Sequence, residues 1–214
     1  METALIIGMG DFGNNVAKRM EELHCEVMAI DSNEERINEI LPYVTNAIIG
    51  DGTNEEFLRS LDIGNFDVCV VALGGHFQSS LETTSLLKDL GANVVVSRAT
   101  NDVQRKFLLR NGADEVVYPE KQMAIRIATK YASKSILDFI ELDNSYSIYE
   151  MKVPKDWHGK SLSQLDIRKK YNVNILTINR NQNVFIPSYD TVIQADDVAF
   201  VIGEDRDIYK CFKI

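Results

Sequence analysis

The segment 5–15, LIIGMGDFGNN, constrains the fold more than any other part of the chain. A short apolar run ends at Gly8, and Gly10 and Gly13 follow it in a G-x-G-x-x-G spacing. Beyond the glycines, apolar residues recur every three or four positions, as on one face of a helix: Phe12, Val16, Met20 and Leu23. A strand, a tight glycine turn and a helix are therefore expected over residues 4–23.

Each glycine has its own role in such a strand–turn–helix unit. Gly8 permits the tight turn, Gly10 lets a pyrophosphate approach the backbone, and Gly13 lets the helix pack close to the sheet. The free N–H groups at the helix start favour a phosphate. Asp31 ends the next apolar run about 20 residues downstream, where a carboxylate accepts hydrogen bonds from ribose hydroxyls. Nucleotide binding is therefore predicted, and the alternative is a glycine turn kept only for packing.

The first two-thirds of the chain alternate between apolar runs and helical patterns. The runs are too continuous for a half-exposed sheet, so they predict strands buried on both faces, at 4–8, 26–31, 46–50, 67–73, 93–99 and 114–119. Helical patterns lie between them at 11–23, 54–61, 77–90 and 102–111, and Gly91 and Gly112 follow two of these where a left-handed cap is needed. This alternation predicts an α/β fold, a Rossmann-type doubly wound parallel sheet.

Residues 119–140 predict a helix that is apolar on two sides. Pro119 suits the first helical turn. The first side carries Ala124, Ile127, Ala128 and Tyr131, and the second carries Ile125, Ala132, Ile136 and Phe139. Such a helix needs two covering surfaces, the parent sheet and either a second domain or a second copy of the chain. A helix fully buried within one domain is the alternative.

The pattern changes after residue 141. Strands are expected at 147–153, 173–180, 183–187 and 197–202, a short helix near 161–171, and a closing helix at 205–213. Strands that follow one another through tight turns, such as RNQN at 180–183, indicate a small α+β domain. The predicted domains are therefore 1–140, which binds nucleotide, and 141–214.

Further candidate contacts lie at the ends of the predicted strands. Asp51 follows the third strand and could accept a hydrogen bond from an adenine amine, or could simply be a turn or cap residue. Ser32 and Asn33 beside Asp31 offer no cation to a 2′-phosphate, which disfavours NADP. The complete set of predicted nucleotide contacts is Gly8, Gly10, Asp11, Phe12, Gly13, Asp31, Ser32, Asp51, Gly52, Thr53, Ala72, Leu73, Gly74 and Arg98.

Charge and composition exclude several classes of function. The 214 residues carry a net charge of −9, which argues against a nucleic-acid partner. Scattered cysteines (Cys25, Cys69 and Cys211) predict buried, inert thiols in a reducing compartment. The histidines, His24, His76 and His158, lack metal-ligand spacing. No signal peptide or membrane-spanning run is evident, so a cytoplasmic protein is expected, which meets a membrane only through a partner.

Catalytic patterns are not recognisable. Lys121 and Lys134 each fall one residue short of a Tyr-x-x-x-Lys pattern with the tyrosine before them, and there is no Walker lysine. A second domain of about 70 residues is small for a substrate domain. A binding module for which the nucleotide is a signal is therefore expected rather than an enzyme. The alternative is a nicotinamide-dependent oxidoreductase.

Over essentially the whole chain the sequence resembles one known family. The resemblance is carried by the motifs GMGDFG, AID, GDGT and VVALG, by the junction NGADEVVYPEKQMAIRIA and by the segment LDIRKKYNVNIL. This is the family of RCK-type regulatory subunits of bacterial Ktr/Trk potassium-uptake systems. The resemblance implies dimers assembled into rings, commonly octameric, under a membrane-embedded potassium-translocating subunit. It also implies gating by ATP, ADP or NAD(H). Glu120 matches a family position that helps to hold a divalent cation, although by itself it could be a first-turn helix residue.

The resemblance further implies a cyclic di-AMP site in the second domain, at Arg168, Asn174, Ile175 and Pro187. The alternatives are a solvated helix charge for Arg168 and a core strand residue for Ile175. Many family members carry arginine at the position of Asp11, and a carboxylate there repels a γ-phosphate. ADP, AMP or NAD(H) is therefore expected to bind at least as well as ATP, unless Arg98 or a metal on Glu120 compensates. A free-standing cyclic-dinucleotide receptor is a further alternative.

Overall fold

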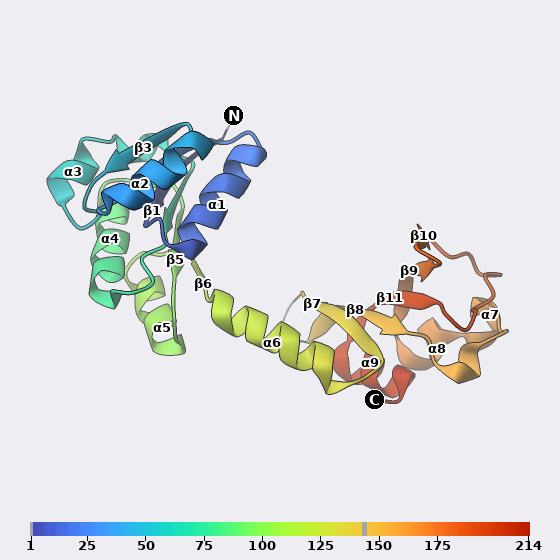
Figure 1. Cartoon of the computed structure of the whole chain (residues 1–214). Helices are drawn as coiled ribbons and strands as arrows, with labels where there is room; N and C mark the ends of the chain where they lie inside the picture. The colour runs from blue at the N-terminus through green and yellow to red at the C-terminus, as the bar shows by residue number, and fades with distance from the viewer. Residues whose placement is uncertain (1, 143–144) are drawn as a thin grey trace. The chain divides into compact units, whose positions relative to one another are not determined.

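The computed structural model describes residues 2–142 and 145–214. Internal contacts divide the chain into a first unit that ends at Glu120 and a second unit from Lys121 to Ile214. Each unit has its own hydrophobic core, and Figure 1 shows the helices and strands of both units. The domain boundary expected near residue 140 stays a prediction.

The first unit contains the predicted six-stranded parallel sheet, with the strand order β3-β2-β1-β4-β5-β6. This order reverses between β1 and β4, which is the switch point of a doubly wound fold. All six predicted strands are confirmed, as β1 Thr3–Ile7, β2 Glu26–Asp31, β3 Asn46–Ile49, β4 Val68–Val71, β5 Val95–Arg98 and β6 Glu115–Val117.

Helices cover both faces of this sheet, as Figure 1 shows. The β1 side chains alternate: Ala4 and Ile6 pack on the α1 and α2 side, whereas Leu5 and Ile7 pack on the α3 and α4 side. This double burial explains why the central strands are apolar without interruption, whereas no residue of the edge strands β3 and β6 is buried, contrary to the expectation for them. The helices are α1 Asp11–Glu22, α2 Glu34–Ile40, α3 Glu55–Arg59, α4 Phe77–Asp89 and α5 Asp102–Arg110, with 3-10 turns η1 Leu41–Tyr43 and η2 Ile63–Asn65.

Gly91 and Gly112 adopt the left-handed backbone expected of them, with φ of +86° and +105°. Helix α2, in contrast, was not expected from the sequence. Its N-cap is Asn33, whose side chain accepts hydrogen bonds from the backbone N–H groups of Glu35 and Arg36. Ile37 and Ile40 then bury one short face against the sheet.

The second unit is built on a five-stranded antiparallel sheet with the order β10-β9-β11-β8-β7. Its core includes Tyr149, Met151, Ile178 and Val201 from the sheet, together with Trp157. Its strands are β7 Ile136–Glu141, β8 Tyr146–Lys152, β9 Asn174–Arg180, β10 Asn183–Phe185 and β11 Val198–Glu204, and its helices are η3 Lys155–Trp157, α7 Leu162–Leu165, α8 Ile167–Tyr171 and α9 Asp205–Phe212.

The expectation of one helix over 119–140 is wrong in its second half. Helix α6 spans Pro119–Ala132 only, and β7 then begins at Ile136. The β7–β8 register shifts between Ile136 and Asp138, which indicates a bulge. A bulge adds one residue to the strand, so Ile136 and Phe139 both reach the core although they are three positions apart. The strand therefore imitates helical spacing.

Two further details of the second unit bear on predictions from the sequence, of which one is corrected and one is confirmed. The single helix expected near 161–171 is two short helices, because Asp166 between them adopts a left-handed backbone with φ of +49°. The tight turn at 180–183 is confirmed as a β9–β10 hairpin, in which Asn181 and Gln182 both have positive φ.

Candidate functional site

A cavity of about 580 Å³ lies at the carboxyl ends of the strands of the first unit. Ligands of open α/β sheets bind in this position, at the switch point between β1 and β4. The predicted residues that line it are Gly8, Gly10, Asp31, Ser32, Asp51, Gly52, Thr53, Ala72, Leu73, Gly74 and Arg98. Residues from five separate segments of the sequence therefore meet in one hollow.

The three loop glycines have distinct surroundings, in agreement with their expected roles. Gly8 turns the chain with φ of +100°. A Cβ on Gly13 would overlap the carbonyl oxygen of Gly8 and would lie 3.1 Å from the Cβ of Ala72, so helix α1 packs close only because Gly13 has no side chain. A Cβ on Gly10 would meet no atom within 4 Å, and no side chain caps α1. The open N-terminus of α1 therefore faces free space.

Asp31 is buried and its carboxylate is already bonded within the protein. Oδ2 accepts a hydrogen bond from the backbone N–H of Met9 at 2.7 Å, and Oδ1 accepts one from the N–H of Asn33 at 2.8 Å. The carboxylate thus ties the glycine loop to the start of α2. Oδ1 keeps lone-pair capacity for a ribose hydroxyl, since it accepts only this one hydrogen bond from the described residues.

The sequence interpretation missed a cation beside Asp31. Nη1 of Arg36 lies 3.4 Å from Oδ2 of Asp31, and Arg36 lines the cavity. The sequence argument against NADP considered only Ser32 and Asn33, whereas Arg36 reaches this carboxylate from the first turn of the unexpected helix α2. The capping pattern at Asn33 was the signal in the sequence that could have revealed it.

Asp51 forms a turn of its own after β3. Its Oδ1 accepts hydrogen bonds from the backbone N–H and the hydroxyl of Thr53, at 2.9 and 2.8 Å. These bonds hold the pKa of Asp51 below its usual range. The turn role expected as one alternative is thus present, while Asp51 still lines the cavity. The helix cap of α3 is Asn54 instead.

Arg98 reaches into the cavity from the end of β5 and pairs with Glu120. Its guanidinium also lies over the ring of Phe12, 5.6 Å from the centroid. The pKa of Glu120 is lowered first by its own backbone N–H; burial opposes this effect, and Arg98 adds to it. Phe12 therefore contacts the site through Arg98, whereas neither Phe12 nor Gly13 lines the cavity itself.

Asp11 lies outside the main cavity. It lines an adjoining hollow together with Asn14, Asn15 and Glu39, and this hollow shares Gly10 and Arg36 with the main cavity. The remaining main-cavity residues that the sequence did not suggest as contacts are Ile7, Asn33, Gly50, Gly75, His76 and Ser79. Most of these are neighbours of predicted residues.

A divalent cation finds no complete ligand set here. In the described part of the chain, no three or more His, Cys, Asp or Glu side chains gather as a metal site would require. Glu120 is a single carboxylate, and it is paired with Arg98. The residues of one chain therefore do not fit a metal at this position, and Glu120 as a metal ligand stays a prediction.

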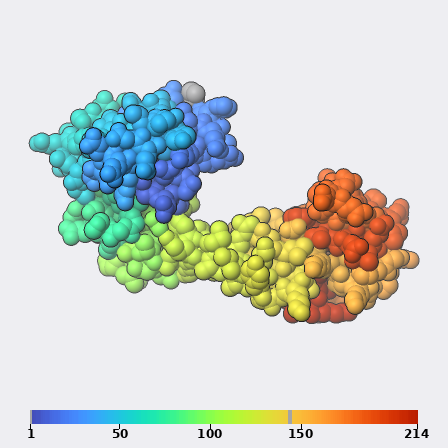
Figure 2. Space-filling view, viewed as in Figure 1, coloured from blue at the N-terminus to red at the C-terminus, as the bar shows by residue number. Residues whose placement is uncertain are grey.

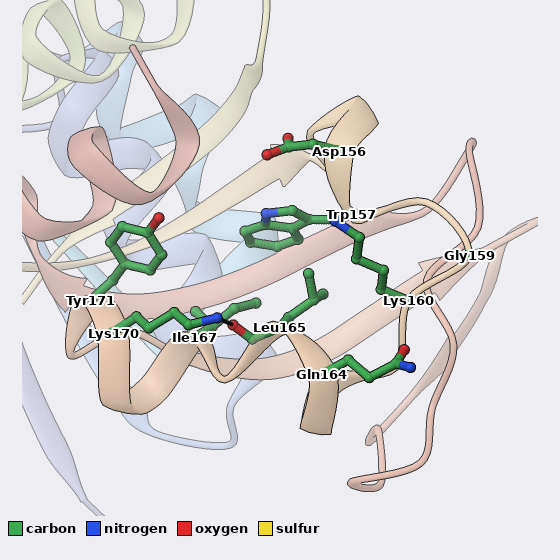
Figure 3. Close-up of a pocket in the computed structure, with 9 residues that line it drawn as sticks. All are labelled: Asp156, Trp157, Gly159, Lys160, Gln164, Leu165, Ile167, Lys170 and Tyr171. Carbon is green, nitrogen blue, oxygen red and sulfur yellow. Dashed lines mark hydrogen bonds between the residues drawn. The ribbon is translucent and has the colours of Figure 1, made fainter.

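The four predicted cyclic di-AMP residues lie on the second unit. Arg168 is exposed on α8, Asn174 begins β9, and Pro187 follows β10. Ile175 packs partly against the core, which matches its alternative interpretation. None of the four lines the cavity of about 460 Å³ that Figure 3 shows.

That second cavity has an apolar floor and a polar rim. Figure 3 shows Trp157 and Leu165 on its walls and Lys170 at its edge. Nζ of Lys170 donates a hydrogen bond to the carbonyl oxygen of Leu165 at 2.9 Å.

Among the described residues, no helix is both long and apolar enough to cross a membrane. Burial raises the pKa of the Cys69 and Cys211 thiols to about 12, as expected for inert thiols.

The fold and the cavity define a class: a Rossmann-type fold with a cavity at its switch point, followed by a small α+β domain. Comparison with family models agrees, since the TrkA-N domain matches residues 4–119 and the TrkA-C domain matches residues 148–214. Among solved structures, the GsuK RCK domain is similar, with a TM-score of 0.69 and 15% identity. The match covers 99% of this chain and 47% of that one, so this chain spans about half of it.

Curated relatives narrow the class. The chain is 40% identical to Ktr system potassium uptake protein C of Bacillus subtilis (strain 168), covering 95% of this chain and 92% of the relative. Protein A of the same system is 35% identical, with the same coverage. Protein A of Vibrio alginolyticus is 31% identical, covering 92% and 90%. This chain therefore belongs to the TrkA-N/TrkA-C (RCK) family that contains the Ktr potassium-uptake proteins, and none of these relatives is named as an enzyme.

Proposed function

We propose that this protein is a cytoplasmic regulatory subunit that couples nucleotide binding to potassium uptake by a membrane-embedded translocating subunit. The single observation that carries the proposal is the cavity at the switch point, where the open N-terminus of α1, the Asp31 carboxylate and the Arg98 guanidinium converge. Membership of the family of the Ktr potassium-uptake proteins supplies the process that such a sensor would regulate.

The ligand of the first unit is an adenine nucleotide or NAD(H). An open helix N-terminus and a guanidinium suit a diphosphate, and Asp31 suits an unsubstituted ribose. Asp11 and Glu39 in the adjoining hollow disfavour the extra charge of a γ-phosphate. A GsuK channel of similar fold, 14% identical to this chain, was solved bound to NAD, which is a likeness of fold alone.

Self-association through α6 would give the sensor subunits whose arrangement can change. No residue of α6 is buried, and Met123, Ile127 and Tyr131 are all at least half exposed. In Figure 2 the segment that contains α6 is coloured yellow-green. A second copy of the chain suits these apolar side chains, and dimers could assemble further into a ring such as an octamer. Binding then gates the partner only by favouring one arrangement of the assembly over another.

Cyclic di-AMP is the second ligand, bound by the second unit. The exposed Arg168 suits a phosphate, Asn174 offers amide hydrogen bonds, and Ile175 with Pro187 offers apolar contact to purines. A divalent cation at Glu120 would have to take further ligands from nucleotide phosphates or from a second chain.

Calorimetry tests the proposal for the first unit. Purified protein is titrated with ATP, ADP, NADH and cyclic di-AMP, with and without magnesium. Gly10→Ala should weaken ADP and NADH binding by about tenfold, because its methyl group occupies the space left for phosphate, while the backbone φ of −71° tolerates alanine. Gly64→Ala is the matched control, because Gly64 does not line the cavity. A Cβ on Gly64 would make one ordinary contact, with the carbonyl oxygen of Gly91 at 3.6 Å. Absence of nucleotide binding to the unmodified protein would refute the proposal.

A further inference from the structure

Three separate elements meet at the guanidinium of Arg98. It lies over Phe12 in the first turn of α1 and donates a hydrogen bond from Nη2 to Oε1 of Glu120 in the first turn of α6. It also lies against Gly74 after β4, where an added Cβ would overlap Nη1. One cation of the nucleotide cavity is thus in contact with the glycine-loop helix, the β4 loop and the start of α6 at once.

The guanidinium is not fully satisfied by these contacts. Its Nε is buried, and none of the described residues accepts a hydrogen bond from it. A buried donor without a partner is unfavourable, so these contacts do not satisfy the guanidinium fully. Because Arg98 lines the cavity, an anion in the hollow at the open N-terminus of α1 would offer the guanidinium further acceptors. Phosphate oxygens match a guanidinium better than most acceptors do.

The two partners of the ion pair differ in their freedom to move. The Arg98 side chain is 19% exposed and is wedged between Phe12 and Gly74, whereas the Glu120 side chain is 53% exposed. When an anion arrives, the arginine therefore stays and the glutamate turns to water. An exposed carboxylate loses little when it leaves such a pair.

We propose that Arg98 transmits the phosphate charge of a bound nucleotide to the first turn of α6, because phosphate and Glu120 compete for the same guanidinium. This inference rests on the proposed function, since it places a nucleotide in the cavity. In the absence of a divalent cation, it assigns Glu120 the role of a displaceable counter-ion. Linkage is reciprocal, so whatever strengthens the Arg98–Glu120 pair weakens nucleotide binding, and the reverse holds as well.

The sign of one substitution tests this competition. Glu120→Gln removes the competing charge and should tighten ADP binding about two- to fivefold, the range of an exposed ion pair. Arg98→Gln should weaken ADP binding about tenfold or more, since a charge-assisted hydrogen bond is lost. In the double variant that carries both substitutions, Glu120→Gln should not change the ADP affinity of Arg98→Gln any further, because no guanidinium remains for which phosphate and Glu120 could compete. Calorimetry on the full chain in EDTA measures all four proteins.

Glu55→Gln is the matched control. Glu55 also pairs with an arginine, Arg59 at 2.6 Å, and it is similarly exposed, but neither residue lines the nucleotide cavity. Its substitution changes the net charge equally and should leave ADP affinity unchanged. A general effect of charge would instead tighten ADP binding in both variants and would overturn the inference.

The other outcomes are also decisive. If Glu120 only positions Arg98, Glu120→Gln weakens ADP binding in EDTA. If Glu120 only holds a metal, Glu120→Gln weakens ADP binding in magnesium. Either result refutes the competition. An unchanged affinity refutes it equally, while the proposed function survives because ADP still binds. If no variant binds ADP, both proposals fail together. The Glu120→Gln result suffices even where Arg98→Gln does not fold.

Discussion

The substitution Asp197→Asn is expected to destabilise the second unit strongly. Asp197 is completely buried before β11, and its carboxylate accepts three hydrogen bonds. Two come from Arg180, from Nε at 2.7 Å and from Nη2 at 2.8 Å, and one comes from the backbone N–H of Gln194 at 2.8 Å. Nη2 of Arg180 also bonds the carbonyl of Val192, so the pair ties β9 to the loop that precedes β11.

The magnitude follows from burial. Removing one partner of a buried ion pair leaves the other charge uncompensated and costs about 3–5 kcal/mol. Asparagine keeps the volume and one acceptor oxygen, so the lower end, about 3 kcal/mol, is expected at Asp197. Asp156→Asn is the matched control, because Asp156 pairs with Lys213 at 2.7 Å while both side chains are more than half exposed. Its effect should lie within measurement error.

Urea unfolding followed by tryptophan fluorescence measures this difference. Trp157 is the only tryptophan of the chain, and it is 4% exposed and 4.9 Å from the ring of Phe212 in the second core. Its emission therefore reports the unfolding of the second unit. With a slope of about 1–2 kcal/mol per molar urea, the midpoint should fall by about 1.5–3 M for Asp197→Asn. Equal midpoints for Asp197→Asn and Asp156→Asn would refute the reasoning.

The same pair predicts a dependence on pH. Burial alone would raise the pKa of Asp197, but the hydrogen bonds from Arg180 and from the N–H of Gln194 outweigh it and lower the pKa. Because the folded pKa lies below the unfolded value of about 3.9, the stabilisation is complete above that value and is lost as the pH falls further. The gap between the unmodified protein and Asp197→Asn should thus be constant from pH 5 to 8 and close in acid. A gap that widens in acid would contradict this.

The remaining predictions concern the proposed interfaces and the second ligand. Ile127→Glu should shift the protein toward a monomer in sedimentation, since it places a charge in the exposed apolar face of α6, while Lys130→Glu on the same helix should not. An unchanged oligomer would remove that face from the interface. Arg168→Ala should weaken cyclic di-AMP by about tenfold in calorimetry and leave ADP unaffected, whereas Lys169→Ala tests whether any exposed cation of α8 suffices. Equal losses would show a general charge effect.

The apolar runs and glycines of the first unit were sufficient to predict its sheet. A parallel strand that is buried on both faces must be apolar throughout, and the first and last glycines of a G-x-G-x-x-G turn are required for steric reasons. The surroundings of Gly8 and Gly13 confirm this, because both pack against neighbouring backbone. The edge where Asp31 and Asp51 meet then follows from the topology, since all parallel strands end on the same side.

The bulged strand β7 shows where local pattern fails. Ile136 and Phe139 have helical spacing, and only pairing with β8 reveals that an inserted residue turns both toward the core. Register belongs to two strands at once, so one segment alone does not determine it. The break at Asp166 is similar, because a left-handed backbone at a non-glycine residue depends on its surroundings.

The sequence by itself determined the fold class, and it located the glycine loop and the end of β2 at one edge of the sheet, because these depend on backbone sterics and on local periodicity. Only the tertiary structure decided which charges face one another across the cavity. Arg36 lies beside Asp31, and Arg98 holds Glu120, which is 22 positions away in the sequence. Long charged side chains pair with the opposite charges that lie near them in space. These charges become neighbours only when the sheet has brought its strand ends together.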